Sequence, residues 1–154
     1  MARGKWFGTI TGMRNRSVPS DRVVAHIVYQ DPVGACVWLS RVFGFRENFR
    51  YGDPVSGVQV LFGKMCLMLN RAKDGTLRPA QLGYGMQSLT LIVDDVDAHY
   101  AKTVAAGATI AEQLSETIYG EREYGVEDLA GLRWIFWQQA RDADPPGWGA
   151  TVNA

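Results

Sequence analysis

The chain has 154 residues, of which 47% are hydrophobic and 21% are charged, and this composition is typical of one globular domain or of two small fused halves. Sixteen basic residues balance sixteen acidic residues. A net charge of zero argues against general nucleic-acid binding and against a polybasic membrane-surface protein. No apolar run approaches the ~20 residues that a membrane helix needs, and no apolar signal-peptide segment stands near the N-terminus. We therefore expect neither a nucleic-acid partner nor a membrane partner.

The two cysteines, Cys36 and Cys66, are too few for a disulfide scaffold and favour a reducing compartment, so we expect a cytoplasmic protein. Residues 1–22 hold five basic side chains and one acidic side chain with no helical or strand period. This pattern predicts a basic N-terminal extension. Residues 139–154 include Pro145 and Pro146 and are expected to form a C-terminal tail.

The first structured segment is predicted over residues 23–70. Residues 23–29 are rich in β-branched side chains, which favours a strand. Asp31 and Pro32 then supply an N-cap and a first helical residue, and hydrophobic residues recur at helical spacing as far as Gly44. Strands are predicted at 45–51, 57–62 and 65–70, between glycine-containing turns. The order is strand, helix and three strands.

The same order returns over residues 87–138. A strand is predicted at 88–93, and a helix begins after the N-cap candidates Asp94 and Asp95 and ends at Gly107. Three more strands are predicted at 109–113, 119–126 and 132–138. Two βαβββ units, 23–70 and 87–138, therefore follow one another across a linker at 71–86, which predicts an α+β fold.

Five short segments resemble the vicinal-oxygen-chelate superfamily of glyoxalase I, bleomycin-resistance proteins and extradiol dioxygenases. They lie at residues 41–45 (Arg-Val-Phe-Gly-Phe), 93–97, 105–108, 119–124 and 126–134. In the last of them, Leu129 stands where the family usually has proline. The resemblance implies that the two βαβββ units form a half-open barrel with a small-molecule site on its concave face. It also implies a homodimer.

Enzymes of this family hold a divalent ion with His, Gln or Glu side chains from four strands. The resemblance carries these four positions onto Val24, Leu67, Ser88 and Ile135. Hydrocarbon side chains and one hydroxyl do not supply the lone pairs that such ions need. We therefore expect no metal and no other cofactor. His26 is either a replacement ligand or, as we prefer, a hydrogen-bonded pocket histidine, while His99 is expected on a solvated helix face.

Side-chain alternation along the predicted strands separates a concave face from a helix-covered face. The residues predicted to face the cavity are Val24, His26, Val28, Met65, Leu67, Leu69, Ser88, Thr90, Ile92, Arg133, Ile135 and Trp137. Those predicted under the helices are Cys66, Leu89, Leu91, Trp134 and Phe136. Tyr119 and Arg122 are placed at the mouth of the cavity. From these sets we select as ligand-binding candidates His26, Leu67, Ser88, Thr90, Tyr119, Arg122, Arg133, Ile135 and Trp137.

Several candidates have a second interpretation. Trp137 either stacks on a flat ligand or fills the cavity. Arg133 either binds an anionic group or pairs with Glu127 or Asp128 near its turn. Arg122 likewise either meets the ligand or forms a surface ion pair.

The predicted cavity is apolar with a few polar points, which is typical of a small-molecule site. We expect a metal-free protein that sequesters a small, partly aromatic or organic-acid ligand, as bleomycin-resistance proteins do. Because the predicted lining holds Arg133 and no carboxylate, a neutral or anionic ligand fits better than a cationic one. The alternatives are a metal-dependent lyase or dioxygenase, an acid/base enzyme that uses His26, and a dimeric regulatory module without a ligand.

Overall fold

The structure is a computed structural model that describes residues 23–82 and 87–152. The predicted basic extension lies outside these ranges. The first unit contains β1 (Ala25–Tyr29), α1 (Pro32–Phe43), β2 (Arg46–Tyr51), β3 (Gly57–Phe62) and β4 (Met65–Arg71). A short helix, α2 (Pro79–Leu82), precedes β5 (Ser88–Ile92), α3 (Val96–Ala105), β6 (Thr109–Glu116), β7 (Glu121–Glu127) and β8 (Arg133–Gln139). A 3-10 turn, η1 (Pro145–Trp148), follows.

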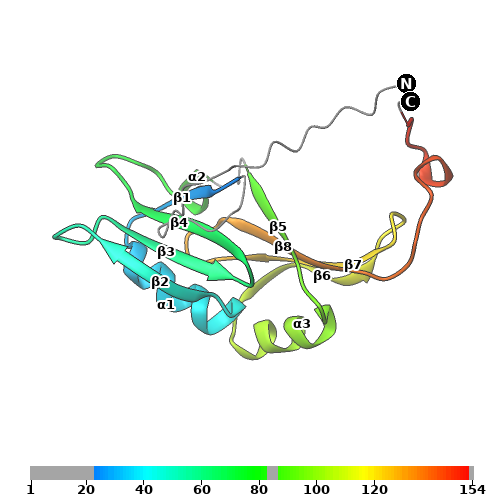
Figure 1. Ribbon diagram of the computed structural model, residues 1–154, viewed down its shortest axis with the longest axis horizontal. Coiled ribbons are helices and arrows are strands. Elements are labelled where there is room, and N and C mark those ends of the chain that lie inside the picture. Colours follow the sequence, from blue (N-terminus) through cyan, green and yellow to red (C-terminus); the bar gives the residue numbers. More distant parts are fainter. Residues whose placement is uncertain (1–22, 83–86, 153–154) are drawn as a thin grey trace, which may run out of the picture.

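The strands form two four-stranded sheets with the same connectivity, in the orders β1-β4-β3-β2 and β5-β8-β7-β6 (Figure 1). In each sheet the strand that comes first in the chain, β1 or β5, pairs in parallel with the strand that comes last in the chain, β4 or β8. The remaining pairs are antiparallel. The predicted α+β fold of two tandem βαβββ units is confirmed. The two sheets remain separate, and no closed barrel forms within the described ranges.

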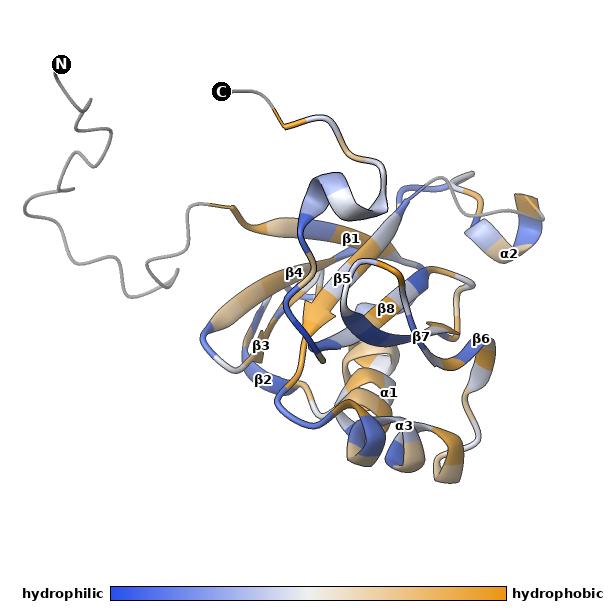
Figure 2. Ribbon diagram, turned by 90° about the vertical axis from the view of Figure 1, so that its right-hand side faces the viewer, coloured by the Kyte–Doolittle hydropathy of each residue, from blue (hydrophilic) through white to orange (hydrophobic). Residues whose placement is uncertain are grey.

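Both main helices begin where the sequence predicts. The Asp31 carboxylate accepts a hydrogen bond from the Val33 amide at 3.1 Å, and the Asp95 carboxylate accepts one from the Ala98 amide at 2.9 Å. α1 ends at Gly44, whose φ of 88° lies in the left-handed region that glycine adopts without strain. α1 and α3 lie side by side on one side of the molecule (Figures 1 and 2).

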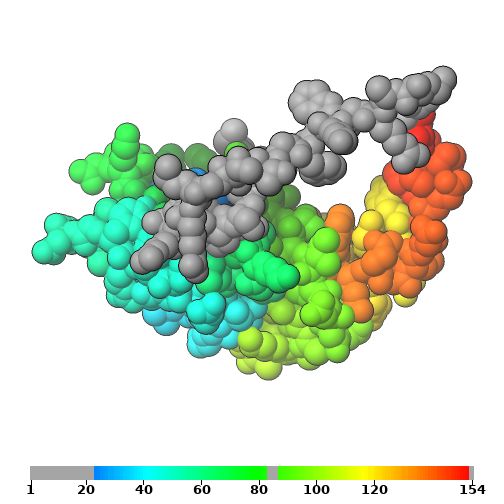
Figure 3. Space-filling view, in the orientation of Figure 1, coloured from blue at the N-terminus to red at the C-terminus, as the bar shows by residue number. Residues whose placement is uncertain are grey.

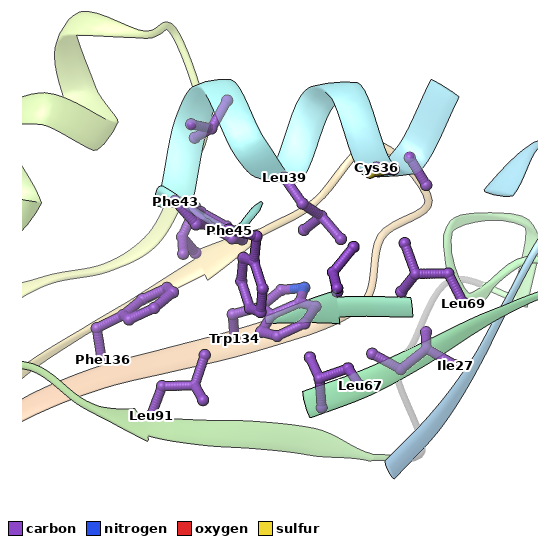
Figure 4. Packing of buried hydrophobic residues seen from close by; sticks show 14 of the residues in the cluster. Ile27, Cys36, Leu39, Phe43, Phe45, Leu67, Leu69, Leu91, Trp134 and Phe136 are labelled. Carbon is purple, nitrogen blue, oxygen red and sulfur yellow. The ribbon is translucent and has the colours of Figure 1, made fainter. Parts of the chain in front are cut away.

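The helix-facing sides of both sheets contribute to one hydrophobic core around α1. Leu67 and Leu69 of β4 and Trp134 and Phe136 of β8 are each at most 2% exposed and belong to this cluster. Figure 4 shows these side chains beneath α1, with Phe43 and Phe45 between the two units. The Phe43 ring lies 5.6 Å from the Trp134 ring and 4.9 Å from the Phe136 ring, measured between centroids. Burial of aromatic surface therefore holds the two units together.

Asp128 forms a second connection between the units. Its Oδ1 accepts hydrogen bonds from the Ala130 and Leu132 amides, at 2.8 and 3.0 Å. Its Oδ2 accepts one from the Trp134 indole at 3.0 Å and one from the Tyr29 hydroxyl at 2.6 Å. The bonds from Ala130, Leu132 and Trp134 shape the turn between β7 and β8. The bond from Tyr29 of β1 joins the first unit to the Asp128 carboxylate. Burial and the adjacent carboxylate raise the pKa of Tyr29, which keeps its hydroxyl as a proton donor.

His99 does not lie on a solvated helix face, which corrects the sequence-based prediction. Its Nε2 is 3.0 Å from the Phe43 carbonyl oxygen, and its Nδ1 is 2.7 Å from the Tyr124 hydroxyl oxygen. Because a carbonyl only accepts, the neutral ring carries its proton on Nε2 and accepts from Tyr124 at Nδ1. Burial lowers the pKa of His99, which favours this neutral form. The hydrophobic pattern of α3 predicted that His99 lies on an exposed face, but the end of α1 packs against this residue.

Candidate functional site

The face of each sheet that points away from the helices carries the candidate site, and we call it the open face. In the second sheet, residues directly paired across β5 and β8 share this face: Ser88 with Arg133, Thr90 with Ile135, and Ile92 with Trp137. Ile92 is 70% exposed, while Ile135 and Trp137 are partly buried. These six positions lie where side-chain alternation predicts. Their ligand-binding role stays a prediction.

The last strand of the first unit faces the other way from the sequence-based prediction. Leu67 and Leu69 are 2% and 0% exposed and lie in the core below α1, so Leu67 does not line the open face. Cys66, Met68 and Asn70 occupy that face instead, because Met68 pairs with His26 across β1. The error has its origin in the turn before β4.

The two turns before the last strands have different lengths. Phe62 pairs with Met65, so only residues 63–64 separate β3 from β4, whereas Glu127 pairs with Arg133 across five residues. Counting a fixed number of residues from the turn glycine therefore shifts the register by one in the first unit. A shift of one residue exchanges the two faces of a strand.

The four family metal positions follow from this register. Thr90 pairs with Ile135 and His26 pairs with Met68, so Met68 rather than Leu67 corresponds to Ile135. The set becomes Val24, Met68, Ser88 and Ile135: two hydrocarbons, a thioether and a hydroxyl, which do not fit a hard or borderline divalent ion. Within residues 23–82 and 87–152, no group of three or more His, Cys, Asp or Glu side chains is arranged to hold a metal ion.

Two other sequence-based candidates have their partners outside the paired residues of the open faces. Arg122 points to the helix side of β7, where its guanidinium forms a bidentate ion pair with Asp97 of α3 at 2.8 and 2.9 Å. Its placement at the cavity mouth was wrong, and the alternative of a surface ion pair is confirmed. Tyr119 lies in the turn between β6 and β7, where its ring packs edge-on against Trp148 at 4.8 Å.

Carboxylates on the second open face were missed in the sequence analysis. Glu123 pairs directly with Trp137 across β7 and β8, and Glu121 pairs with Gln139 on the same face. Glu112 of β6 forms an ion pair with Arg133, in place of the expected Glu127 or Asp128. The predicted strand at 119–126 includes Glu123, but Glu123 is missing from the residues predicted to face the cavity, although it alternates with the buried Tyr124 and Val126.

The environment of Glu123 is electrostatically unfavourable for its own charge. Partial burial raises the pKa of Glu123, and the neighbouring Glu112 and Glu121 raise it further, while Arg133 opposes them. A further positive charge near Glu123 would stabilise its ionised form. The second open face thus combines an aromatic ring with an excess of carboxylates.

The first open face is polar and uncharged around His26. The Asn48 side chain donates to the Gln59 amide oxygen at 2.7 Å, and the Gln59 amide nitrogen is 3.4 Å from the Met68 sulfur. The His26 Nδ1 is 3.1 Å from the Asn70 amide nitrogen. None of these amide residues was identified from the sequence, because their partners come from all four strands of the first sheet.

A cavity between the edge strands β1 and β5 brings His26 and Ser88 together. Its volume is about 410 Å³, and Thr76, Gln87 and Leu89 also line it. This size lies within the range of small-molecule sites. In the space-filling view, the surface is also hollowed between the green region around β5 and the orange-to-red segment that follows β8 (Figure 3).

In the described part of the chain, no helix is long and apolar enough to cross a membrane.

Two βαβββ units with helices on one side and open sheet faces on the other define a glyoxalase-like architecture. The model of the Glyoxalase/Bleomycin resistance protein/Dioxygenase superfamily matches residues 21–136, and the chain belongs to this superfamily. An uncharacterised protein of Mycobacterium bovis is 32% identical over 129 residues, which cover 77% of this chain and 84% of that protein.

Solved structures show the same architecture. TioX from Micromonospora sp. ML1 is 33% identical, with a TM-score of 0.65 over 77% of this chain and 98% of that one. A glyoxalase/bleomycin resistance protein/dioxygenase from Nocardioides is 13% identical, with a TM-score of 0.64 over 94% and 93% of the two chains. At that level of identity the likeness concerns the fold alone.

Proposed function

We infer that the protein binds and sequesters a small, partly aromatic molecule on its open faces without a protein-bound metal ion. The observation that carries this proposal is the position of Trp137, which is partly buried in the middle of the second open face. Ile92 and Glu123 are its direct neighbours across the adjoining strands. An aromatic ring between an exposed aliphatic side chain and a carboxylate suits a flat ligand.

The carboxylates change the charge expected of the ligand. Because Arg133 is already paired with Glu112, Glu121 and Glu123 leave an excess of negative charge around Trp137. An anionic ring is therefore disfavoured at this end, and a neutral or positively charged ring is favoured. This replaces the preference for a neutral or anionic ligand, which assumed that no carboxylate was present.

The enzymatic alternatives have weaker support. A metal-dependent lyase or dioxygenase needs ion ligands at positions that hold Val24, Met68, Ser88 and Ile135. An acid/base enzyme needs a second titratable group near His26. Tyr29 also lines this cavity, but its hydroxyl donates to Asp128 and its pKa is raised by burial. The homodimer, the cytoplasmic location and a role in antibiotic resistance stay proposals.

The test is a calorimetric titration with two probes of matched shape, 2-naphthylmethylamine and 2-naphthoate. We expect the amine to bind more tightly than the carboxylate. Trp137→Leu should weaken binding of the amine roughly ten-fold, because it removes the aromatic surface on which the ring stacks.

Tyr119→Leu is the matched control, since it removes an aromatic side chain that lies in the turn between β6 and β7 and packs against Trp148. It should leave binding of both probes unchanged. Loss of binding in Tyr119→Leu with none in Trp137→Leu would contradict the proposed site, and failure of both probes to bind the native protein would count against the proposed function.

A further inference from the structure

Three side chains on the first open face form a continuous hydrogen-bonded row. The Tyr51 hydroxyl of β2 donates to the Asn70 Oδ1 of β4 at 2.8 Å. The Asn70 Nδ2 lies 3.1 Å from the His26 Nδ1 of β1. The row ends at His26, which is exposed and lines the cavity between β1 and β5.

Gly57 makes this row possible. It lies on β3 between Tyr51 and Asn70 and pairs directly with both residues. A Cβ added at Gly57 would overlap the Tyr51 ring. The absence of a side chain therefore lets the tyrosine cross β3 and reach Asn70.

The orientation of the Asn70 amide follows from its other contacts. Its Nδ2 is 3.5 Å from the Met68 carbonyl oxygen, which only accepts hydrogen bonds. Reversing the amide would place Oδ1 against that oxygen and would remove the acceptor that faces Tyr51. Nδ2 therefore faces His26 and donates to its Nδ1.

This contact decides which ring nitrogen of His26 holds the proton. A nitrogen that accepts a hydrogen bond has no proton of its own, so the neutral imidazole carries its proton on Nε2. In the part of the chain that the structure describes, Nε2 makes no hydrogen bond. The ring thus offers an unused N–H donor at the cavity between β1 and β5.

We propose that Asn70 and Tyr51 hold His26 as an Nε2–H donor, and that the ligand carries an oxygen acceptor, a carbonyl or carboxylate, at this point. The acceptor part of this statement rests on the proposed ligand-binding function. Asn70 and Tyr51 are positioning residues that act through His26. In this tautomer Nε2 has no lone pair to take a proton, so His26 binds a ligand and does not act as a base there.

The tautomer is measured on the protein alone, by nitrogen NMR of 15N-histidine-labelled chain in the pH range where His26 is neutral. The chain has only two histidines, so a His26→Asn sample assigns the spectrum. We expect the proton of His26 on Nε2. In Asn70→Asp the carboxylate accepts from Nδ1–H, and we expect the proton to move to Nδ1.

Asn48→Asp is the matched control, because it places the same charge on the same open face at a residue whose hydrogen-bond partner is Gln59 and not His26. It should leave the His26 tautomer unchanged. A native protein with the proton on Nδ1, or the same tautomer in Asn70→Asp as in the native chain, would overturn the proposal.

The ligand side is tested with 2-acetylnaphthalene and 2-ethylnaphthalene, which differ by one carbonyl oxygen. The native protein should prefer the acetyl compound by roughly five- to ten-fold, the ratio expected for one hydrogen bond. His26→Phe and Asn70→Asp should both abolish this preference. Equal affinity of the native protein for the two probes would overturn the proposal that the ligand places an oxygen acceptor at His26. Binding of neither probe would count against the proposed function and would leave the tautomer result standing.

Discussion

Replacing Asp128 with alanine is expected to lower the free energy of unfolding by about 4 kcal/mol, measured by urea denaturation. The Asp128 carboxylate is 7% exposed and accepts four hydrogen bonds. Its loss leaves the Trp134 indole N–H and the Tyr29 hydroxyl without an acceptor in a buried region. Leaving buried donors unsatisfied costs more than the hydrogen bonds themselves contribute.

Two smaller changes divide this effect. Tyr29→Phe removes the single bond to the first unit and should cost about 1 kcal/mol. Asp128→Asn keeps Oδ1 but turns an amide N–H₂ toward the Tyr29 and Trp134 donors, so an intermediate loss is expected. Asp142→Ala, at an exposed carboxylate, should change stability by less than about 0.5 kcal/mol. If Asp128→Ala behaved like Asp142→Ala, Asp128 would not connect the two units.

Phe43→Ala is expected to lower the free energy of unfolding by about 4 kcal/mol, through a cavity in the shared core. Phe43 is 1% exposed, and its ring contacts Trp134 and Phe136 of the second unit. Because the core is shared, the variant should lose both units in a single transition. Circular dichroism and tryptophan fluorescence should therefore report the same denaturation midpoint.

The matched control is Val37→Ala on the same helix, where the side chain is 62% exposed. We expect it to change the free energy of unfolding by less than about 0.5 kcal/mol. Two separate transitions in Phe43→Ala would contradict a common core and would indicate that each βαβββ unit has a core of its own.

Local patterns in the sequence predicted most of the fold. The N-caps Asp31 and Asp95 and the doubled strand order are properties of neighbouring residues, and the structure confirms them. The open face of the second sheet was likewise predicted, because Trp134 and Phe136 alternate cleanly with Ile135 and Trp137. The alternation of side chains assigns residues to the correct face of a strand where the start of the strand is known.

The site was predicted less completely, for two physical reasons. In the first unit both faces of β4 are largely apolar, so hydropathy alone does not distinguish Leu67 from Met68, and the difference in turn length decides. The remaining omissions depend on partners that are distant in the sequence. Asn70 acquires its role from Tyr51 and His26, and His99 is partly covered by the end of α1. Neither arrangement leaves a local pattern.

The open faces are expected to bind a small molecule with no metal ion held by the protein. The most direct test measures the affinity for 2-naphthylmethylamine by calorimetry, first after removal of metals with a chelator and then with added Zn²⁺, Ni²⁺, Mn²⁺ or Fe²⁺. We predict the same dissociation constant in every sample and no stoichiometric metal by elemental analysis. Binding that appears only with one of these ions, present at one ion per chain, would contradict the claim.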